Sequence, residues 1–226
     1  MHIPTVFRVF GLLVMIFSLS MLPPLGLSLY FEDGGWIAFS FSFFITLSAG
    51  FICWFLCRHA KNELKGRDGF LIVVMFWIVL SIFGAIPLMI AETPSLSFTD
   101  AVFETVSGFT TTGSTVLTEI DYLPHAIAYY RQQLQFLGGM GIVVLAVAIL
   151  PMLGIGGMQL YRAEVPGPAK DAKMTPRITQ TAKALWYIYV GLVVLCAFAY
   201  WAAGMTPFDA LGESFATLST GGFSMH

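Results

Sequence analysis

Charged side chains are scarce in this chain of 226 residues, at 11% of the total against about a quarter in a typical soluble domain. Hydrophobic residues make up 57% and the mean hydropathy is +0.80, which argues against a water-soluble globule. The 21 Phe and 5 Trp argue against a disordered chain, because so much apolar surface does not stay solvated. The net charge is −2, so the chain lacks the excess of basic residues that would indicate a nucleic-acid partner.

Cysteines are also few, and all three stand inside apolar runs, which argues against a disulfide framework. Cys53 and Cys57 are four residues apart, but two thiols are too few ligands for a metal site. No nucleotide-binding glycine loop, catalytic triad or paired acid and base stands out in the sequence. We therefore expect an all-α integral membrane protein that is not an enzyme and holds no organic cofactor.

Five apolar stretches are long enough to cross a bilayer, since a spanning helix needs roughly 20 residues to cover about 30 Å of hydrocarbon. The first is too long for a cleaved signal peptide, and Pro23 and Pro24 stand where a cleavage site would be expected. The five stretches are Thr5–Tyr30, Trp36–Leu56, Gly69–Ile90, Ala126–Met158 and Ala184–Ala203.

The basic residues predict the topology. If the stretches alternate in direction, every Lys and Arg except Arg131 falls on one side. By the positive-inside rule that side is cytoplasmic, and it includes the N-terminus. Most acidic residues fall on the outer side, where net negative charge would concentrate cations. The alternative is that acidic side chains merely tolerate the outside.

Two short segments, 97–114 and 206–223, repeat each other without a gap at an offset of 109 residues. Asp100 pairs with Asp209, Glu104 with Glu213, Thr111 with Thr220, and Gly113 with Gly222. Each segment follows a spanning stretch, so the repeat unit is larger than the match itself. Both segments are too short and too polar to cross the membrane alone.

Each segment begins with a helix-capping pattern. Ser97 and Thr206 are candidate N-caps, with Asp100 and Asp209 three residues later, and Pro207 is tolerated at a first helical position. From cap to Thr/Gly cluster is about 11 residues, or roughly 16 Å of helix, which is half a bilayer. The chain must then turn back as irregular backbone.

Irregular backbone at membrane depth persists only where protein buries it or where it lines water. A half-helix points its partly negative C-terminus toward the membrane centre, and bare carbonyl oxygens can replace the hydration shell of a cation. The pair of segments thus predicts cation-conducting re-entrant loops. The alternative is that both Thr/Gly clusters are turns between amphipathic surface helices, and duplication in register favours the pore.

The patterns Thr111-Thr112-Gly113-Ser114 and Ser219-Thr220-Gly221-Gly222-Phe223 resemble the filters of the Trk/Ktr/HKT superfamily of potassium transporters. The resemblance implies a potassium channel folded into one chain, with four repeats of outer helix, pore half-helix, filter loop and inner helix. We expect two N-terminal helices (1–66), a first repeat (67–160), a cytoplasmic loop (161–182) and a second repeat (183–226) truncated after its filter. The chain would be the N-terminal part of a longer one.

The resemblance further implies potassium uptake across the bacterial inner membrane, with rubidium as a second cargo and modest discrimination against sodium. The implied partners are membrane lipid, a second copy in a homodimer, and a cytosolic nucleotide-binding regulatory subunit, TrkA. Two loops are basic, Arg58–Arg67 and Arg162–Lys183. They are either the surfaces on which the regulatory subunit docks or ordinary cytoplasmic loops. A cation-coupled secondary transporter and a non-conducting anchor subunit are the alternative functions. The implied filter residues are Thr111, Thr112, Gly113, Thr220, Gly221 and Gly222, with K⁺ held by Thr111, Thr112, Thr220 and Gly221.

Several other residues have two interpretations. Arg131 either repels ions or braces the filter, or it forms an ion pair with Glu104, Asp100 or a neighbouring repeat, since a charge at membrane depth needs a partner. Glu104 and Glu213 either attract potassium or, as we favour, tie the pore helix to its surroundings. The glycines of the fourth stretch either form a hinge or, as we favour, allow close packing. They are Gly138, Gly139 and Gly141.

Overall fold

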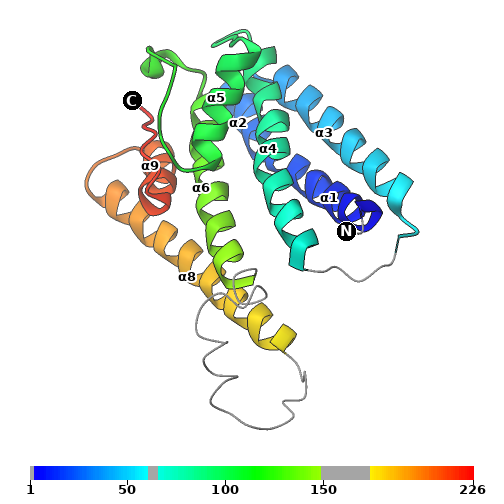
Figure 1. Ribbon diagram of the computed structural model, residues 1–226. Helices are drawn as coiled ribbons and strands as arrows, with labels where there is room; N and C mark the ends of the chain where they lie inside the picture. Colours follow the sequence, from blue (N-terminus) through cyan, green and yellow to red (C-terminus); the bar gives the residue numbers. More distant parts are fainter. Residues whose placement is uncertain (1–2, 61–65, 149–173) are drawn as a thin grey trace.

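The computed structural model describes residues 3–60, 66–148 and 174–226, and within these ranges every regular element is a helix (Figure 1). The prediction of an all-helical fold is confirmed. The parts predicted at 149–158 and 161–173 lie outside the described residues.

The N-terminal part is a helical hairpin. A long first arm consists of α1 (Ile3–Ser18), a 3₁₀ turn η1 (Leu19–Met21) and α2 (Leu22–Phe31), so the predicted first span is interrupted just before its two prolines. The second arm, α3 (Trp36–Cys57), packs along α1. A Cβ atom on Gly11 would lie 2.8 Å from the carbonyl oxygen of Gly50, so glycine permits this close approach.

Two half-helices alternate with longer helices in the rest of the chain. α4 (Gly66–Ile90) is followed by the short α5 (Phe98–Phe109), a 3₁₀ turn η2 (Ile120–Tyr122) and α6 (His125–Ala148). Then α8 (Met174–Ala202) leads to the short α9 (Pro207–Ser219). α8 begins well before the predicted start at Ala184, so part of the predicted loop is helical.

Four helical segments of the described chain are long and apolar enough to cross a membrane: Ile3–Phe31, Trp36–Cys57, Leu71–Ile90 and Gln180–Ala202. The fourth predicted span, Ala126–Met158, corresponds to α6 (His125–Ala148), whose buried side chains include several polar ones. It lies between α4 and α5 on one side and α8 and α9 on the other (Figure 1). Tyr130, Arg131, Gln132, Leu134 and Gln135 of α6 are all fully buried.

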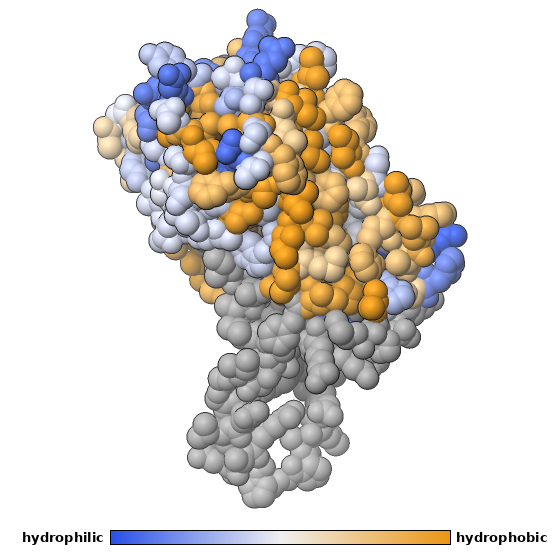
Figure 2. Space-filling view, turned by 45° about the horizontal axis from the view of Figure 1, so that its top comes forward, coloured by the Kyte–Doolittle hydropathy of each residue, from blue (hydrophilic) through white to orange (hydrophobic). Residues whose placement is uncertain are grey.

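Large apolar side chains lie exposed along the outer helices, where a bilayer would cover them. Figure 2 shows hydrophobic side chains across the middle of one face, with hydrophilic ones gathered toward its ends. In α8, Leu192, Val194, Leu195 and Phe198 are all exposed. The described surface is therefore that of a protein whose middle part is surrounded by the hydrocarbon core of a membrane.

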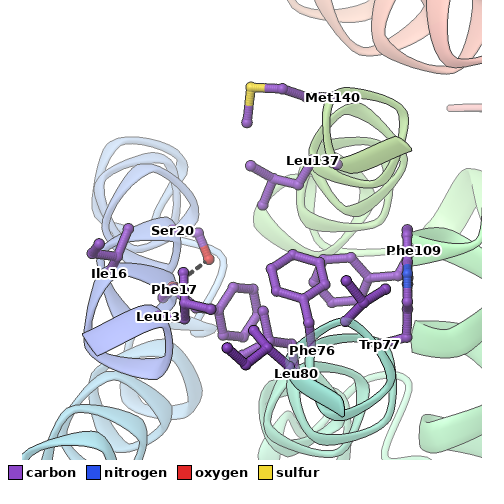
Figure 3. A pocket seen from close by; sticks show the side chains of 13 residues that line it. Leu13, Ile16, Phe17, Ser20, Phe76, Trp77, Leu80, Phe109, Leu137 and Met140 are labelled. Atoms are coloured by element: carbon purple, nitrogen blue, oxygen red, sulfur yellow. Dashed lines mark hydrogen bonds between the residues drawn. The ribbon is translucent and has the colours of Figure 1, made fainter. Parts of the chain in front are cut away.

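An apolar cavity of about 360 Å³ lies between α1 of the N-terminal hairpin and the helices α4 and α6 (Figure 3). Its walls come from α1, α4 and α6, and include Phe17, Trp77 and Leu137. Phe109, the last residue of α5, also reaches this cavity and contacts Phe17, with a centroid distance of 5.4 Å between the two rings. The end of the first half-helix is thus anchored in the apolar core.

Candidate functional site

Both half-helices begin at the predicted caps. The Ser97 hydroxyl accepts a hydrogen bond from the Asp100 amide at 3.3 Å and donates one to the Asp100 carboxylate at 2.8 Å. Thr206 makes the same two contacts with Asp209, at 3.2 and 2.6 Å. The helices run for 12 and 13 residues, which is the predicted half-bilayer length.

The two loops after the half-helices share one backbone conformation. Positive φ angles recur at equivalent positions, 54° at both Thr111 and Thr220, 77° at Gly113 and 88° at Gly222. The amide that follows each of these threonines donates a hydrogen bond to a carbonyl oxygen of the preceding half-helix. Thr112 N–H donates to the Ser107 carbonyl and Gly221 N–H to the Ala216 carbonyl, both at 2.9 Å. Positive φ at alternate residues breaks the extended-strand pattern in which successive carbonyls point to opposite sides.

The two loops lie directly against each other. A Cβ atom on Gly113 would overlap the carbonyl oxygen of Gly221 and lie 3.2 Å from the Cα of Gly222. A Cβ on Gly222 would contact nothing in the described chain, so that position needs glycine only for its φ angle. Thr112, Thr220 and Gly222 are exposed, Thr111 and Gly113 are half-buried, and Gly221 is buried. Residues 109 apart in sequence are therefore brought to one place.

Helix α6 passes between the ends of the two half-helices, and two consecutive glycines make room for them. A Cβ on Gly138 would overlap the carbonyl oxygen of Phe109, where α5 ends. A Cβ on Gly139 would lie 3.0 Å from the Cβ of Ser219, where α9 ends. Close packing is therefore confirmed at these two positions. Gly141 has no neighbour nearer than 3.7 Å in the described chain, so packing does not require a glycine there.

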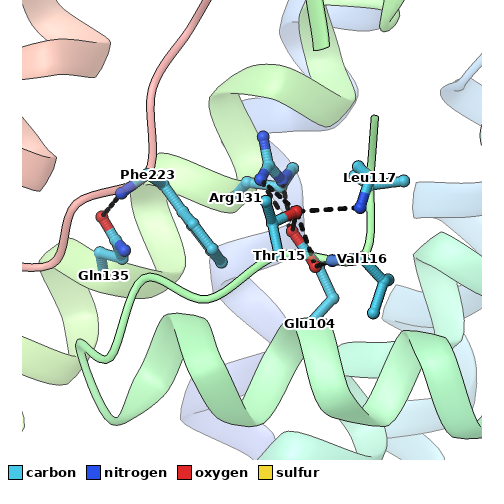
Figure 4. A network of polar contacts seen from close by, with 7 residues as sticks. All are labelled: Glu104, Thr115, Val116, Leu117, Arg131, Gln135 and Phe223. Carbon is cyan, nitrogen blue, oxygen red and sulfur yellow. Dashed lines mark hydrogen bonds and ion pairs between the residues drawn. The ribbon is translucent and has the colours of Figure 1, made fainter. Parts of the chain in front are cut away.

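A buried carboxylate holds the chain that leaves the first loop (Figure 4). Glu104 of α5 accepts hydrogen bonds from the Thr115 hydroxyl at 2.8 Å and the Val116 amide at 3.1 Å. Arg131 of α6 pairs with the same carboxylate at 2.8 Å, and both side chains are fully buried. The predicted ion pair and the structural role of Glu104 are confirmed.

The second repeat has the same tether. Glu213 accepts from the Ser224 hydroxyl at 2.9 Å and from the Met225 amide at 2.6 Å, which are 11 and 12 residues further along the chain. Thr115 and Ser224 were missed by sequence reasoning as functional residues. They could have been found by extending the 109-residue alignment past the glycines, where it pairs one hydroxyl side chain with the other.

The first repeat also reaches into the second loop. Gln135 of α6 accepts a hydrogen bond from the Phe223 amide at 3.3 Å, and the Arg131 guanidinium lies 4.4 Å from the centre of the Phe223 ring. Figure 4 shows Gln135 and Arg131 on the same helix, with Phe223 extending between them. No local sequence pattern marks Gln135, because its partner is 88 residues away.

The end of the site at which His226 lies is acidic. His226 lies between two carboxylates, 3.3 Å from Asp121 and 3.5 Å from Asp209. Asp33, from the turn between α2 and α3, accepts a hydrogen bond from the Ala126 amide at 2.9 Å and so caps α6. Because Arg131 is buried in its ion pair, it adds no exposed positive charge at this end. The negative charge of these carboxylates favours cations over anions in their surroundings.

Known proteins are similar to this chain in sequence and in fold. A family model described as "TrkH: Cation transport protein" matches residues 37–226. The Trk system potassium uptake protein TrkH of Halomonas elongata is 62% identical over all 226 residues, and TrkH of Escherichia coli K12 is 58% identical. TrkG of Escherichia coli K12 is 47% identical over 225 residues.

A solved structure agrees with these relatives. The crystal structure of the potassium transporter TrkH from Vibrio parahaemolyticus matches the whole chain with a TM-score of 0.88 and 53% sequence identity, and the match covers 45% of that transporter. The chain spans about half the length of the curated relatives it matches, since it covers 46–47% of the three named above. The predicted membrane fold is confirmed by this match. The chain belongs to the TrkH family of cation transport proteins.

Proposed function

We propose that this chain forms part of the potassium-conducting subunit of a Trk-type uptake system, with rubidium as a second cargo and no covalent chemistry. One observation supports this most strongly: two half-helices end in loops of the same unusual backbone shape, and those loops meet at Gly113 and Gly221. Turns that merely connect surface helices would have no reason to meet each other, or to pack against the same helix, α6.

The proposed filter consists of backbone oxygens from both loops. Carbonyl groups past the end of a helix have no helical partner and can replace water around a monovalent cation. Two loops enclose only part of an axis, so two further repeats from the rest of the protein would complete the ring. The proposed filter residues are Thr111, Thr112, Gly113, Thr220, Gly221 and Gly222, with K⁺ held by Thr111, Thr112, Thr220 and Gly221.

The proposed cellular setting is the bacterial inner membrane, with the N-terminus in the cytoplasm. The distribution of Lys and Arg supports this orientation. Relatives named as components of Trk systems support a multi-part assembly, which we propose to be a homodimer with a nucleotide-binding regulatory subunit, TrkA. The domain division at 66, 160 and 182 belongs to the same proposal.

Substitution of the loop glycines in the complete protein tests the filter. Gly113→Ser places a side chain against the Gly221 carbonyl and in a strained φ region, so ion discrimination should change markedly. Gly222→Ser adds only the backbone strain and should have a smaller effect. Rubidium and sodium fluxes into proteoliposomes provide the measurement.

Gly191→Ser on α8 is the matched control, because a Cβ there contacts nothing in the described chain and its φ is ordinary. It should transport like the parent protein. Unchanged discrimination in both Gly113→Ser and Gly222→Ser, in protein that assembles normally, would overturn the filter assignment.

A further inference from the structure

We infer that Arg131 and Gln135, on the inner helix of the first repeat, are positioning residues for the filter of the second repeat. This inference rests on the proposed function, because a filter must exist for its geometry to matter. Neither side chain needs to touch the ion. They hold the second loop from behind, so that one helix sets the geometry of both loops.

Gln135 packs against the second loop at Gly221. A Cβ on Gly221 would lie 2.5 Å from the Gln135 Oε1 and 2.6 Å from its Nε2, so the amide plane lies against the backbone of the loop. The same Oε1 accepts the Phe223 amide at 3.3 Å. Gln135 is fully buried, so its position is fixed by packing as well as by this hydrogen bond.

Arg131 links the two loops. Its Nε and Nη2 atoms contact the Glu104 carboxylate, and Nη2 donates to Thr115 at 3.1 Å, which anchors it to the first repeat. Its guanidinium faces the Phe223 ring at 4.4 Å, a distance at which a cation and an aromatic face attract. A displacement of Phe223 would therefore be transmitted to the network that fixes the first loop.

The places where the two loops differ in sequence support this assignment. The 109-residue offset pairs the exposed Thr112 with the buried Gly221, and the exposed Ser114 with the buried Phe223. These two differences fall on the residues that Gln135 and Arg131 contact. A side chain at position 221 would collide with Gln135, and a small residue at 223 would leave the Arg131 face bare. The second loop is adapted to the helix behind it.

A pair of glutamine variants in the complete protein tests the role of Gln135. Gln135→Met keeps the volume but removes the acceptor for Phe223. Gln133→Met is the control, because Gln133 is a buried glutamine of the same helix whose Nε2 donates instead to Ser20 of η1, at 2.9 Å. The Rb⁺/Na⁺ flux ratio should change about fivefold in the first variant, the factor that corresponds to one hydrogen bond, and stay at the parental value in the second. Equal ratios in the two variants would overturn the inference.

A double-mutant cycle tests the link through Arg131. Arg131→Lys keeps the charge for Glu104 but loses the planar face, and Phe223→Leu removes the ring. If Arg131 acts on the filter through Phe223, the change in flux ratio in the double variant should be smaller than the product of the two single changes. A change equal to that product would show that the two residues act independently and would contradict the inference. If Gln135→Met fails to assemble, this cycle still tests the part of the inference that concerns Arg131.

The glycine variants described above separate this inference from the proposed function. If Gly113→Ser changes discrimination while Gln135→Met behaves like Gln133→Met, the filter assignment stands and the positioning role is wrong. If the glycine variants also leave discrimination unchanged, the filter assignment itself is wrong.

Discussion

The buried ion pair between Glu104 and Arg131 gives the sharpest stability prediction. Neither side chain is exposed, and the Glu104 Oε1 lies 2.8 Å from the Arg131 Nη2. Glu104→Gln keeps an oxygen for the Thr115 hydroxyl and the Val116 amide but leaves the guanidinium without a counter-charge. Because breaking a buried pair strands a charge, the variant should lose about 3–5 kcal/mol of unfolding free energy.

A compensating substitution tests the physical reason. Arg131→Met in the Glu104→Gln background removes the stranded charge, so the double variant should recover at least about half of the loss. The exposed Glu119→Gln is the control and should stay within about 0.5 kcal/mol of the parent. Denaturant unfolding of the complete protein in detergent provides the comparison. A Glu104→Gln variant as stable as Glu119→Gln, or a double variant less stable than the single one, would refute the reasoning.

Two further predictions concern the inner helix α6. Gly138→Ala forces a methyl group onto the Phe109 carbonyl and should lower the unfolding free energy by about 1–3 kcal/mol. Gly141→Ala should be neutral or slightly stabilising, because its methyl group would meet Phe76 and Trp77 at ordinary van der Waals distances of 3.7 Å or more. Thermal unfolding of the two variants side by side is the measurement, and equal losses would contradict the prediction. Asp33→Ala removes the cap on the Ala126 amide and should cost about 1 kcal/mol in denaturant unfolding, and a value equal to that of the exposed Glu119→Ala would count against the cap.

The half-helices could be predicted from the sequence because their signals are local. A capping residue, an acidic residue three positions later and a Thr/Gly cluster one half-bilayer further on are all visible within 18 residues. Their repetition at a constant offset added the evidence that a single segment lacks. The structure places the caps at Ser97 and Thr206, as predicted.

Contacts between distant segments could not be predicted in the same way. Gln135 and Phe223 are 88 residues apart, and Asp33 and Ala126 are 93 apart, with no periodicity that connects them. Hydropathy predicted α6 as an ordinary span. Its buried Arg and Gln side chains are instead explained by its interior position between two half-helices, a tertiary property that a linear pattern does not encode.

The anomalous scattering of rubidium in crystals of the complete protein tests the central claim most directly. A metal ion that binds bare carbonyl oxygens should produce a peak in direct contact with the backbone of Thr111, Thr112, Thr220 and Gly221. Rubidium density elsewhere in the protein, with none between these two loops, would contradict the proposal that they form a filter.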